Sequence, residues 1–208
     1  MEIQYYGANS IKITTKKSVI SIDPQSDIAE LKTDLKKTNT VLATQPALAK
    51  GISDELFLVT SPGEYEFEDY SVKGIAAQPH TGSTGDMSAT MYRVSSADTS
   101  ILFVGHVDSK LTEEQLEAIG MVDIVVVPVG GSGYTLDTVG AAAVVRAVEP
   151  KVVIPVHSSD DGLVYSVPQT ATELFVKELG AVVSEDVTDK FKVKLLPEQL
   201  TIQLLTKS

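Results

Sequence analysis

The sequence contains no cysteine, only three histidines, and 17 basic residues against 28 acidic ones. Without cysteine there are no disulfides, thiolate metal ligands or cysteine nucleophiles, which fits a reducing interior. The net charge of −11 would repel a phosphate backbone, and the lysines form no stripe, so we expect no nucleic-acid binding. No apolar run approaches the length of a membrane span, and the N-terminus lacks a signal-peptide pattern. We therefore expect a cytoplasmic protein that binds no membrane.

Two motifs of common enzyme classes are also missing. No Gly-x-Ser-x-Gly elbow is present, so a serine hydrolase has no support. No Gly-Lys-Ser/Thr follows the glycine-rich stretch at residues 128–135, so that stretch is not a P-loop. With 43% hydrophobic and 22% charged residues over 208 positions, the composition is that of a globular protein, and we expect one domain over residues 1–208.

The first hundred residues are typical of β-strands. Short segments rich in Ile, Val, Tyr and Thr alternate with Gly, Pro, Asn and Asp, and they predict an antiparallel sheet or sheets. The segments are residues 2–7, 10–15, 18–23, 40–44, 56–61, 70–77, 90–96 and 100–106. The lysine-rich residues 32–39 lack an apolar stripe and predict a solvated turn or a short helix.

The second half alternates helix and strand patterns. Residues 111–120 predict a helix with a capping box formed by Thr112 and Gln115, and residues 137–150 predict a helix of small residues. A helix is also expected over 168–180, with Pro168 at its start. Strands are expected over 123–129, 151–157, 181–186, 191–197 and 200–206. Strands followed by alternating strands and helices predict an α/β fold of sheets covered by helices.

The three histidines, His80, His106 and His157, each close a strand-like run. Strand ends are places where β scaffolds position ligands, and three neutral imidazoles would leave a tetrahedral metal ion one position for water. The alternative is that three unrelated imidazoles hydrogen-bond nearby backbone without any metal. The spacing of these single residues along the chain does not choose between the two.

Other polar features also have two interpretations. The loop at residues 128–135, with Gly130, Gly131 and Thr135, could cradle an anion at a helix N-terminus or be a tight turn. Asp23 could orient a histidine or bond amides of its own turn. The acidic residues 61–69 are interpreted as a solvated hairpin with its turn at Pro62-Gly63.

The order of these pieces resembles the metallo-β-lactamase superfamily, and more narrowly the predicted hydrolases close to the ascorbate-6-phosphate lactonases. The segments that carry the resemblance are Ile-Asp-Pro at 22–24, Ala-Thr at 43–44, PGEYE at 62–66, Gly-His at 105–106, PVGGSGYT at 128–135 and EPKVVIPVH at 149–157. The resemblance implies an αββα sandwich: two mixed sheets packed face to face with helices on the outer faces. It also implies a cleft in which two metals activate water.

The family hallmark Thr-His-x-His-x-Asp-His corresponds here to residues 44–50. Gln, Ala, Ala and Lys stand at its ligand positions, and neither alanine nor lysine replaces an imidazole or a carboxylate. By the same resemblance, His80 and His157 stand at ligand positions, and His106 replaces the bridging aspartate. A two-metal centre of the usual form is therefore not expected.

These residues lead to several hypotheses. The first is a hydrolase with one Zn ion on His80, His106 and His157, where Asp108 or Tyr134 takes the proton. The alternative is a pseudoenzyme whose fold persists as a binding or assembly module, and metal-free proton transfer by the histidines is a third. The small-molecule substrate or ligand is not identified. The strand at 200–206 would pair either within the sheet or with another subunit in a homo-oligomer.

Overall fold

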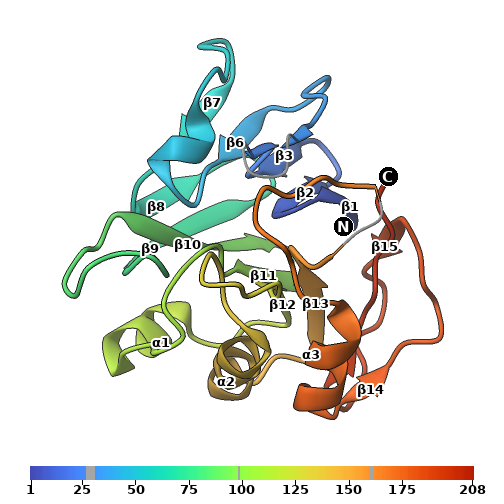
Figure 1. Cartoon of the computed structure of the whole chain (residues 1–208). Coiled ribbons are helices and arrows are strands. Elements are labelled where there is room, and N and C mark those ends of the chain that lie inside the picture. Colours follow the sequence, from blue (N-terminus) through green and yellow to red (C-terminus); the bar gives the residue numbers. More distant parts are fainter. Residues whose placement is uncertain (27–30, 98, 160–161) are drawn as a thin grey trace.

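The computed structural model describes residues 1–26, 31–97, 99–159 and 162–208, which form two stacked β-sheets (Figure 1). The six-stranded sheet has the order β15 (Lys190–Lys192), β1 (Glu2–Gly7), β2 (Ser10–Thr14), β3 (Val19–Ile22), β6 (Thr40–Leu42), β7 (Phe57–Val59). The eight-stranded sheet has the order β14 (Val182–Val183), β16 (Thr201–Ile202), β13 (Val152–Val156), β12 (Ile124–Pro128), β11 (Thr99–Phe103), β10 (Ala89–Ser96), β9 (Ser71–Ala77), β8 (Gly63–Glu66). A small third pair joins β4 (Gln25–Ser26) and β5 (Leu31–Lys32).

Both large sheets are mixed. In the six-stranded sheet β1, β2 and β3 pair antiparallel, whereas β3, β6 and β7 run parallel. In the eight-stranded sheet β8 to β11 are antiparallel, and β11, β12, β13, β16 and β14 are parallel. The expectation of purely antiparallel pairing in the first half was therefore wrong, because strand periodicity identifies the buried face of a strand but not its partner.

Three helices pack on the outer face of the eight-stranded sheet (Figure 1): α1 (Glu113–Ile119), α2 (Thr138–Val148) and α3 (Thr172–Leu179). The capping box of α1 is present, since Thr112 Oγ1 accepts from the Gln115 amide and the Gln115 side chain accepts from Thr112 N–H. Asp137 caps α2 through the amide of Gly140. None of these helices, nor any other in the described part of the chain, is long and apolar enough to cross a bilayer.

Two apolar cores result from this layering. One core lies between the two sheets and is built from Ile and Val of the strands, with Tyr92 among the largest fully buried side chains. The other lies between the eight-stranded sheet and the helices, where the small residues of α2 allow close packing and Phe175 of α3 is completely buried. The α/β sandwich expected from the sequence is confirmed.

Several local expectations differ from the structure. The turn of the acidic hairpin lies between Phe67 and Tyr70, not at Pro62-Gly63, because β8 already begins at Gly63. Helix α3 begins at Thr172, so Pro168 lies before it rather than in its first turn. Pro46–Ala49 form a 3-10 helix, η1, that the sequence did not predict. Two expectations that had left alternatives open are decided: residues 33–39 form a turn and no helix, and strand β16 pairs within its own sheet, with β13 and β14.

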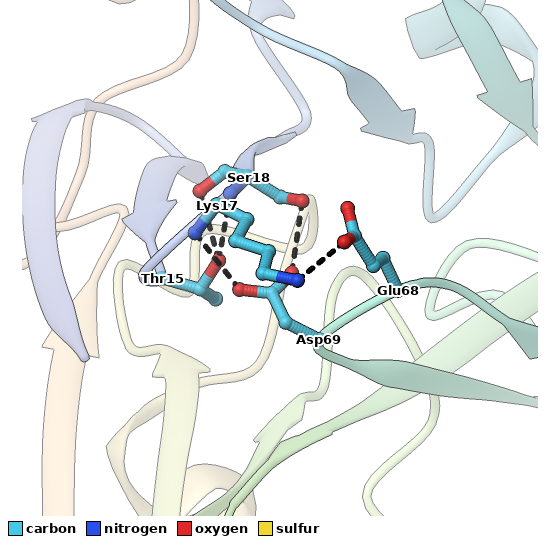
Figure 2. A network of polar contacts seen from close by, with 5 residues as sticks. All are labelled: Thr15, Lys17, Ser18, Glu68 and Asp69. Carbon is cyan, nitrogen blue, oxygen red and sulfur yellow. Dashed lines mark hydrogen bonds and ion pairs between the residues drawn. The ribbon is translucent and has the colours of Figure 1, made fainter.

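A polar network joins the β2–β3 turn of one sheet to the β8–β9 turn of the other (Figure 2). The Asp69 carboxylate accepts hydrogen bonds from the Lys17 amide at 3.0 Å and from Ser18 Oγ at 2.9 Å, and the Lys17 ammonium pairs with Glu68. Partial burial opposes ionisation of Asp69, but the bonds from Thr15, Lys17 and Ser18 outweigh it and lower the pKa of this carboxyl. The ionised form of Asp69 therefore helps to hold the two sheets together.

Replacement of Asp69 by asparagine is expected to lower the free energy of unfolding by about 1 kcal/mol at pH 7, since these charge-assisted bonds lie at a partly exposed site. Because the folded state lowers the pKa of Asp69, this contribution is present above its ordinary pKa and is lost as the pH falls through the lowered pKa. Urea unfolding of the protein and of Asp69→Asn at pH 7 and pH 3 measures it. The role would be contradicted if Asp69→Asn lowered the free energy of unfolding equally at both pH values. It would also be contradicted if Asp54→Asn, at an exposed position, lowered it as much.

Candidate functional site

Two of the predicted histidines meet at the carboxyl ends of the parallel strands. His106 follows β11 and His157 follows β13, the two strands that flank β12 in the eight-stranded sheet. Parallel strands end at one edge, so the loops after them converge there. Tyr134, from the loop between β12 and α2, joins the two imidazoles.

The rings of this site are closely packed. His106 and His157 meet edge to face with their centroids 4.8 Å apart, and Tyr134 lies 4.8 Å from His106 and 5.6 Å from His157. Tyr165, from the segment after His157, lies 5.1 Å from the His157 ring. His106 is 4% exposed and His157 is not exposed at all. The four rings are called the aromatic cluster below, and both of its imidazoles are buried.

Burial keeps both imidazoles neutral. It is the main cause that lowers the pKa of His157 to about 4, although the bond to Gln169 works against it. Burial and then the neighbouring His157 and His80 hold the pKa of His106 well below its ordinary value. Within the described residues, His106 Nδ1 and His157 Nε2 have no hydrogen-bond partner. Buried polar atoms are normally paired, so these two nitrogens are unusual.

The backbone around His157 is tightly constrained. His157 has a φ of 51° and its N–H donates to the carbonyl of Ala8, which itself has a φ of 47°. Non-glycine residues rarely adopt this left-handed region, and such strain often accompanies functional sites. His157 Nδ1 lies 3.0 Å from Gln169 Oε1. A Cβ on Gly130 would lie 2.0 Å from that oxygen and 2.1 Å from the His157 carbonyl, so only glycine fits there.

Asp23 holds the segment that corresponds to the family hallmark. Its carboxylate accepts from Thr44 N at 2.8 Å and from Thr44 Oγ1 at 2.6 Å, and it is buried at the end of β3. Burial raises the pKa of Asp23 to about 6, against the opposing effect of the bonds from Thr44 and Asn9. Beyond Thr44, Gln45 reaches the His106 carbonyl at 3.5 Å and η1 follows. Asp23 therefore orients the loop next to the imidazoles and does not bond a histidine directly.

His80 and Asp108 lie beside the aromatic cluster rather than in it. The His80 N–H donates to the His106 carbonyl, and the Asp108 N–H donates to the Gln78 carbonyl, so the two segments pair through a short antiparallel bridge. Asp108 lines a cavity of about 350 Å³ together with Lys110 and Gln78. The remaining lining residues are Ala77, Thr84, Met87, Leu111, Thr112 and Gln115. Of the site residues predicted from the sequence, Asp108 lines this cavity and the three histidines do not.

The glycine-rich loop uses amides for its own structure. Gly131 N–H donates to the Leu136 carbonyl, while the amides of Tyr134 and Thr135 donate to the Gly131 carbonyl. Thr135 is fully buried and its Oγ1 has no partner within the described residues. Anion binding by Gly130, Gly131 and Thr135 stays a prediction.

Sequence reasoning missed three side chains of this site. Gln169 bonds His157, Tyr165 covers its ring, and Gln45 reaches the chain at His106. Tyr165 lies in a segment without regular periodicity, and Gln169 falls in the predicted helix 168–180, so no sequence pattern tied either residue to His157. Gln45 was noticed only as a departure from the hallmark.

Comparisons with known proteins place the chain in a family. A family model described as a beta-lactamase superfamily domain matches residues 2–157. A metallo-β-lactamase superfamily protein from Thermotoga maritima matches with a TM-score of 0.74 at 18% identity, over 99% of this chain and 98% of that one. The chain therefore belongs to the metallo-β-lactamase superfamily. No curated protein matches it.

Other solved structures share the fold at low identity. Igni18, a metallo hydrolase from the archaeon Ignicoccus hospitalis, is 16% identical with a TM-score of 0.62, over 86% of this chain and 90% of that one. The metallo-β-lactamase fold protein YhfI from Bacillus subtilis is 8% identical with a TM-score of 0.61, over 100% and 97% of the two chains. At these identities the likeness shows the fold alone.

Membership of the family implies a metal centre, and such a centre requires several grouped side chains as ligands. The two unpaired imidazole nitrogens could each donate to an ion. However, no three His, Asp or Glu side chains in residues 1–26, 31–97, 99–159 and 162–208 are grouped so that they could hold one. The cluster also offers no carboxylate to balance the charge of an ion. The described residues therefore do not fit the metal centre of the family.

Asp23→Asn is expected to flatten the pH dependence of stability. Because the folded state raises the pKa of Asp23 from 3.8 to about 6, the folded protein loses stability as the pH rises from about 4 to about 6. The loss amounts to about 3 kcal/mol. An asparagine without a charge accepts the Thr44 amide through its Oδ1, while its Nδ2 donates to Thr44 Oγ1 in place of the bond that the hydroxyl donates to Asp23. Urea unfolding at pH 4 and pH 7 measures the change, with Glu55→Gln as an exposed control, and an unaltered pH dependence in Asp23→Asn would refute it.

Gly130→Ala is expected to lower the free energy of unfolding by roughly 3 kcal/mol or more, or to prevent folding, because its Cβ would overlap Gln169 and the His157 carbonyl. Gly133→Ala is the matched control: Gly133 has a φ of 72° but nothing within 4 Å of an added Cβ. It should cost only about 1 kcal/mol of backbone strain. The denaturant midpoints of the two variants measure these losses of stability. If both variants lost the same free energy of unfolding, close packing at Gly130 would be ruled out.

Proposed function

We propose that this chain is a non-hydrolytic member of the metallo-β-lactamase superfamily that works as a small-molecule binding module. The observation that carries the proposal is the burial of the imidazole pair, with His157 unexposed beneath its neighbouring rings. A hydrolytic metal centre needs an open position where water and substrate reach the ion. The aromatic cluster fills the corresponding space with side chains.

The loop after Thr44 supports the same proposal. By the family resemblance, the ligand positions of the hallmark fall on Gln45, Ala47, Ala49 and Lys50, and all four belong to or flank the 3-10 helix η1. An amide, two methyl groups and an ammonium supply no ligand comparable to an imidazole or a carboxylate. The fold keeps the Asp23–Thr44 support of this loop but not the ligands that the support would position.

The cavity of about 350 Å³ lined by Asp108 and Lys110 is the binding site in this proposal. It opens between the β9–β10 loop and the start of α1, and its volume lies at the lower end of the range for small-molecule sites. Asp108 and Lys110 are the charged groups in its wall. Membership of the narrower branch close to the ascorbate-6-phosphate lactonases stays a prediction.

A second candidate is a hydrolase with one metal ion on His80, His106 and His157. It is favoured by the two buried imidazole nitrogens without a partner, which an ion could bind if the rings rearranged and His80 approached. The influence of His80 on the pKa of His106 supports their proximity. Igni18, which shares the fold, is described as a metallo hydrolase, and this description makes a metal-dependent hydrolase the natural alternative.

Metal analysis of the untagged protein separates the two candidates. The binding module is expected to retain less than about 0.1 zinc, iron or manganese per chain after incubation with each metal and removal of the excess, because a cluster without three grouped ligands binds ions weakly. Hydrolysis of ester, lactone and phosphodiester model substrates should proceed at the same rate in the protein and in His106→Ala/His157→Ala.

The opposite result would establish the second candidate. One metal ion per chain that is lost in His106→Ala, in His157→Ala and also in His80→Ala, together with hydrolysis that follows the metal content, would overturn the non-hydrolytic proposal. Metal loss in the first two variants but not in His80→Ala would show binding by the imidazole pair alone.

A further inference from the structure

We propose that the cavity lined by Asp108 and Lys110 binds a free α-amino acid with an apolar side chain. The inference rests on the proposed function in one respect, namely that this cavity is the binding site of the module. It goes beyond that function because it names the chemical class of the ligand from the groups in the cavity wall. No residue of the aromatic cluster takes part in it.

The cavity wall carries two opposite charges that do not neutralise each other. Asp108 Oδ1 accepts the Lys110 amide at 2.8 Å, which fixes the turn, but the Lys110 ammonium is not paired with that carboxylate. Among the ion pairs of the described residues, none includes Asp108 or Lys110. A ligand that carries both an ammonium and a carboxylate would satisfy the two charges at once.

The amides in the wall are already engaged. Gln78 Oε1 accepts from the Gly85 amide at 3.2 Å. The Gln115 side chain donates to the Ala76 carbonyl at 2.8 Å and accepts from Thr112 N–H at 2.9 Å. These bonds hold the wall in place rather than leaving the amides to select a ligand. Selection by charge therefore falls to Asp108 and Lys110.

Apart from the exposed Thr84 and Thr112, the rest of the wall is apolar. Ala77 forms part of the buried floor, Leu111 is partly buried against the helix core, and Met87 is 50% exposed at the rim. A methionine at a rim adapts to different apolar groups because its side chain is flexible. Such a wall accepts an aliphatic side chain, whereas a third charge on the ligand would lose water without gaining a partner.

The size of the cavity fits the same class of ligand. About 350 Å³ is near the lower limit for sites of drug-sized molecules, which favours a single amino acid over a longer peptide or a nucleotide. The overall charge of −11 further disfavours a polyanionic ligand. Leucine is the simplest probe that has both charges and an aliphatic side chain.

Isothermal titration of the full-length protein with leucine, N-acetyl-leucine and leucinamide tests the proposal. The first analogue lacks the ammonium and the second lacks the carboxylate. Each is expected to bind about tenfold or more weakly than leucine, because each loses a charge-assisted contact. Failure of leucine to bind at millimolar concentration, or equal affinity for all three compounds, would refute the proposal with the unaltered protein alone.

Two variants assign the contacts. Asp108→Asn should weaken leucine binding about tenfold while leaving N-acetyl-leucine unchanged, and Lys110→Met should weaken leucine while leaving leucinamide unchanged. Asp54→Asn and Lys194→Met, at exposed positions outside the cavity, are the matched controls, and circular dichroism monitors folding. Variants that bind leucine as tightly as the controls do would overturn the assignment.

The outcome is separable from that of the metal analysis. Leucine binding that depends on Asp108 and Lys110 in a protein that also holds one metal ion would leave this inference standing and refute the non-hydrolytic function. Absence of leucine binding in a metal-free, inactive protein would refute this inference and leave the non-hydrolytic function standing.

Discussion

The hydrogen-bonded pair of Asp23 and Thr44 links the two sheets at the edge where the candidate site lies. Asp23 accepts both the amide and the hydroxyl of Thr44, and the Thr44 carbonyl accepts the Thr90 amide from the other sheet. A Cβ on Gly105 would lie 2.7 Å from Thr44, so the strand that leads to His106 passes directly over this threonine. Through these contacts Thr44 aligns the two sheets at this edge. The cost is a carboxylate buried with a raised pKa.

The carboxyl ends of the parallel strands lie at this same edge and explain why the rings of the aromatic cluster meet there. Parallel strands β11, β12 and β13 bring His106, Tyr134 and His157 together whether or not a metal is present, because the convergence is a property of the sheet. With Tyr165 added, the rings pack on one another as an apolar core would. The accessible cavity lies between the β9–β10 loop and the start of α1 and carries the charges of Asp108 and Lys110. None of the four rings of the aromatic cluster lines it.

Local patterns predicted much of the fold. The capping box of α1, the buried strands β12 and β13, and the small-residue helix α2 have the expected positions, because each depends on residues near one another in the chain. The parallel pairing of β3 with β6 was missed, since strand partners are chosen by long-range packing. Helix α3 began later than Pro168 suggested because Gln169 bonds His157 instead of starting a helix.

The sequence by itself determined the chemical inventory: no cysteine, three histidines, and Gln, Ala, Ala and Lys at the hallmark positions. It also pointed to the superfamily through motifs that stand on strand ends. Only the tertiary structure decided that His106 and His157 are buried and neutral among tyrosines, while Asp108 lines a cavity. The reason is physical: burial and ring packing depend on which distant segments cover a side chain, and no local pattern ties Tyr165 or Gln169 to His157.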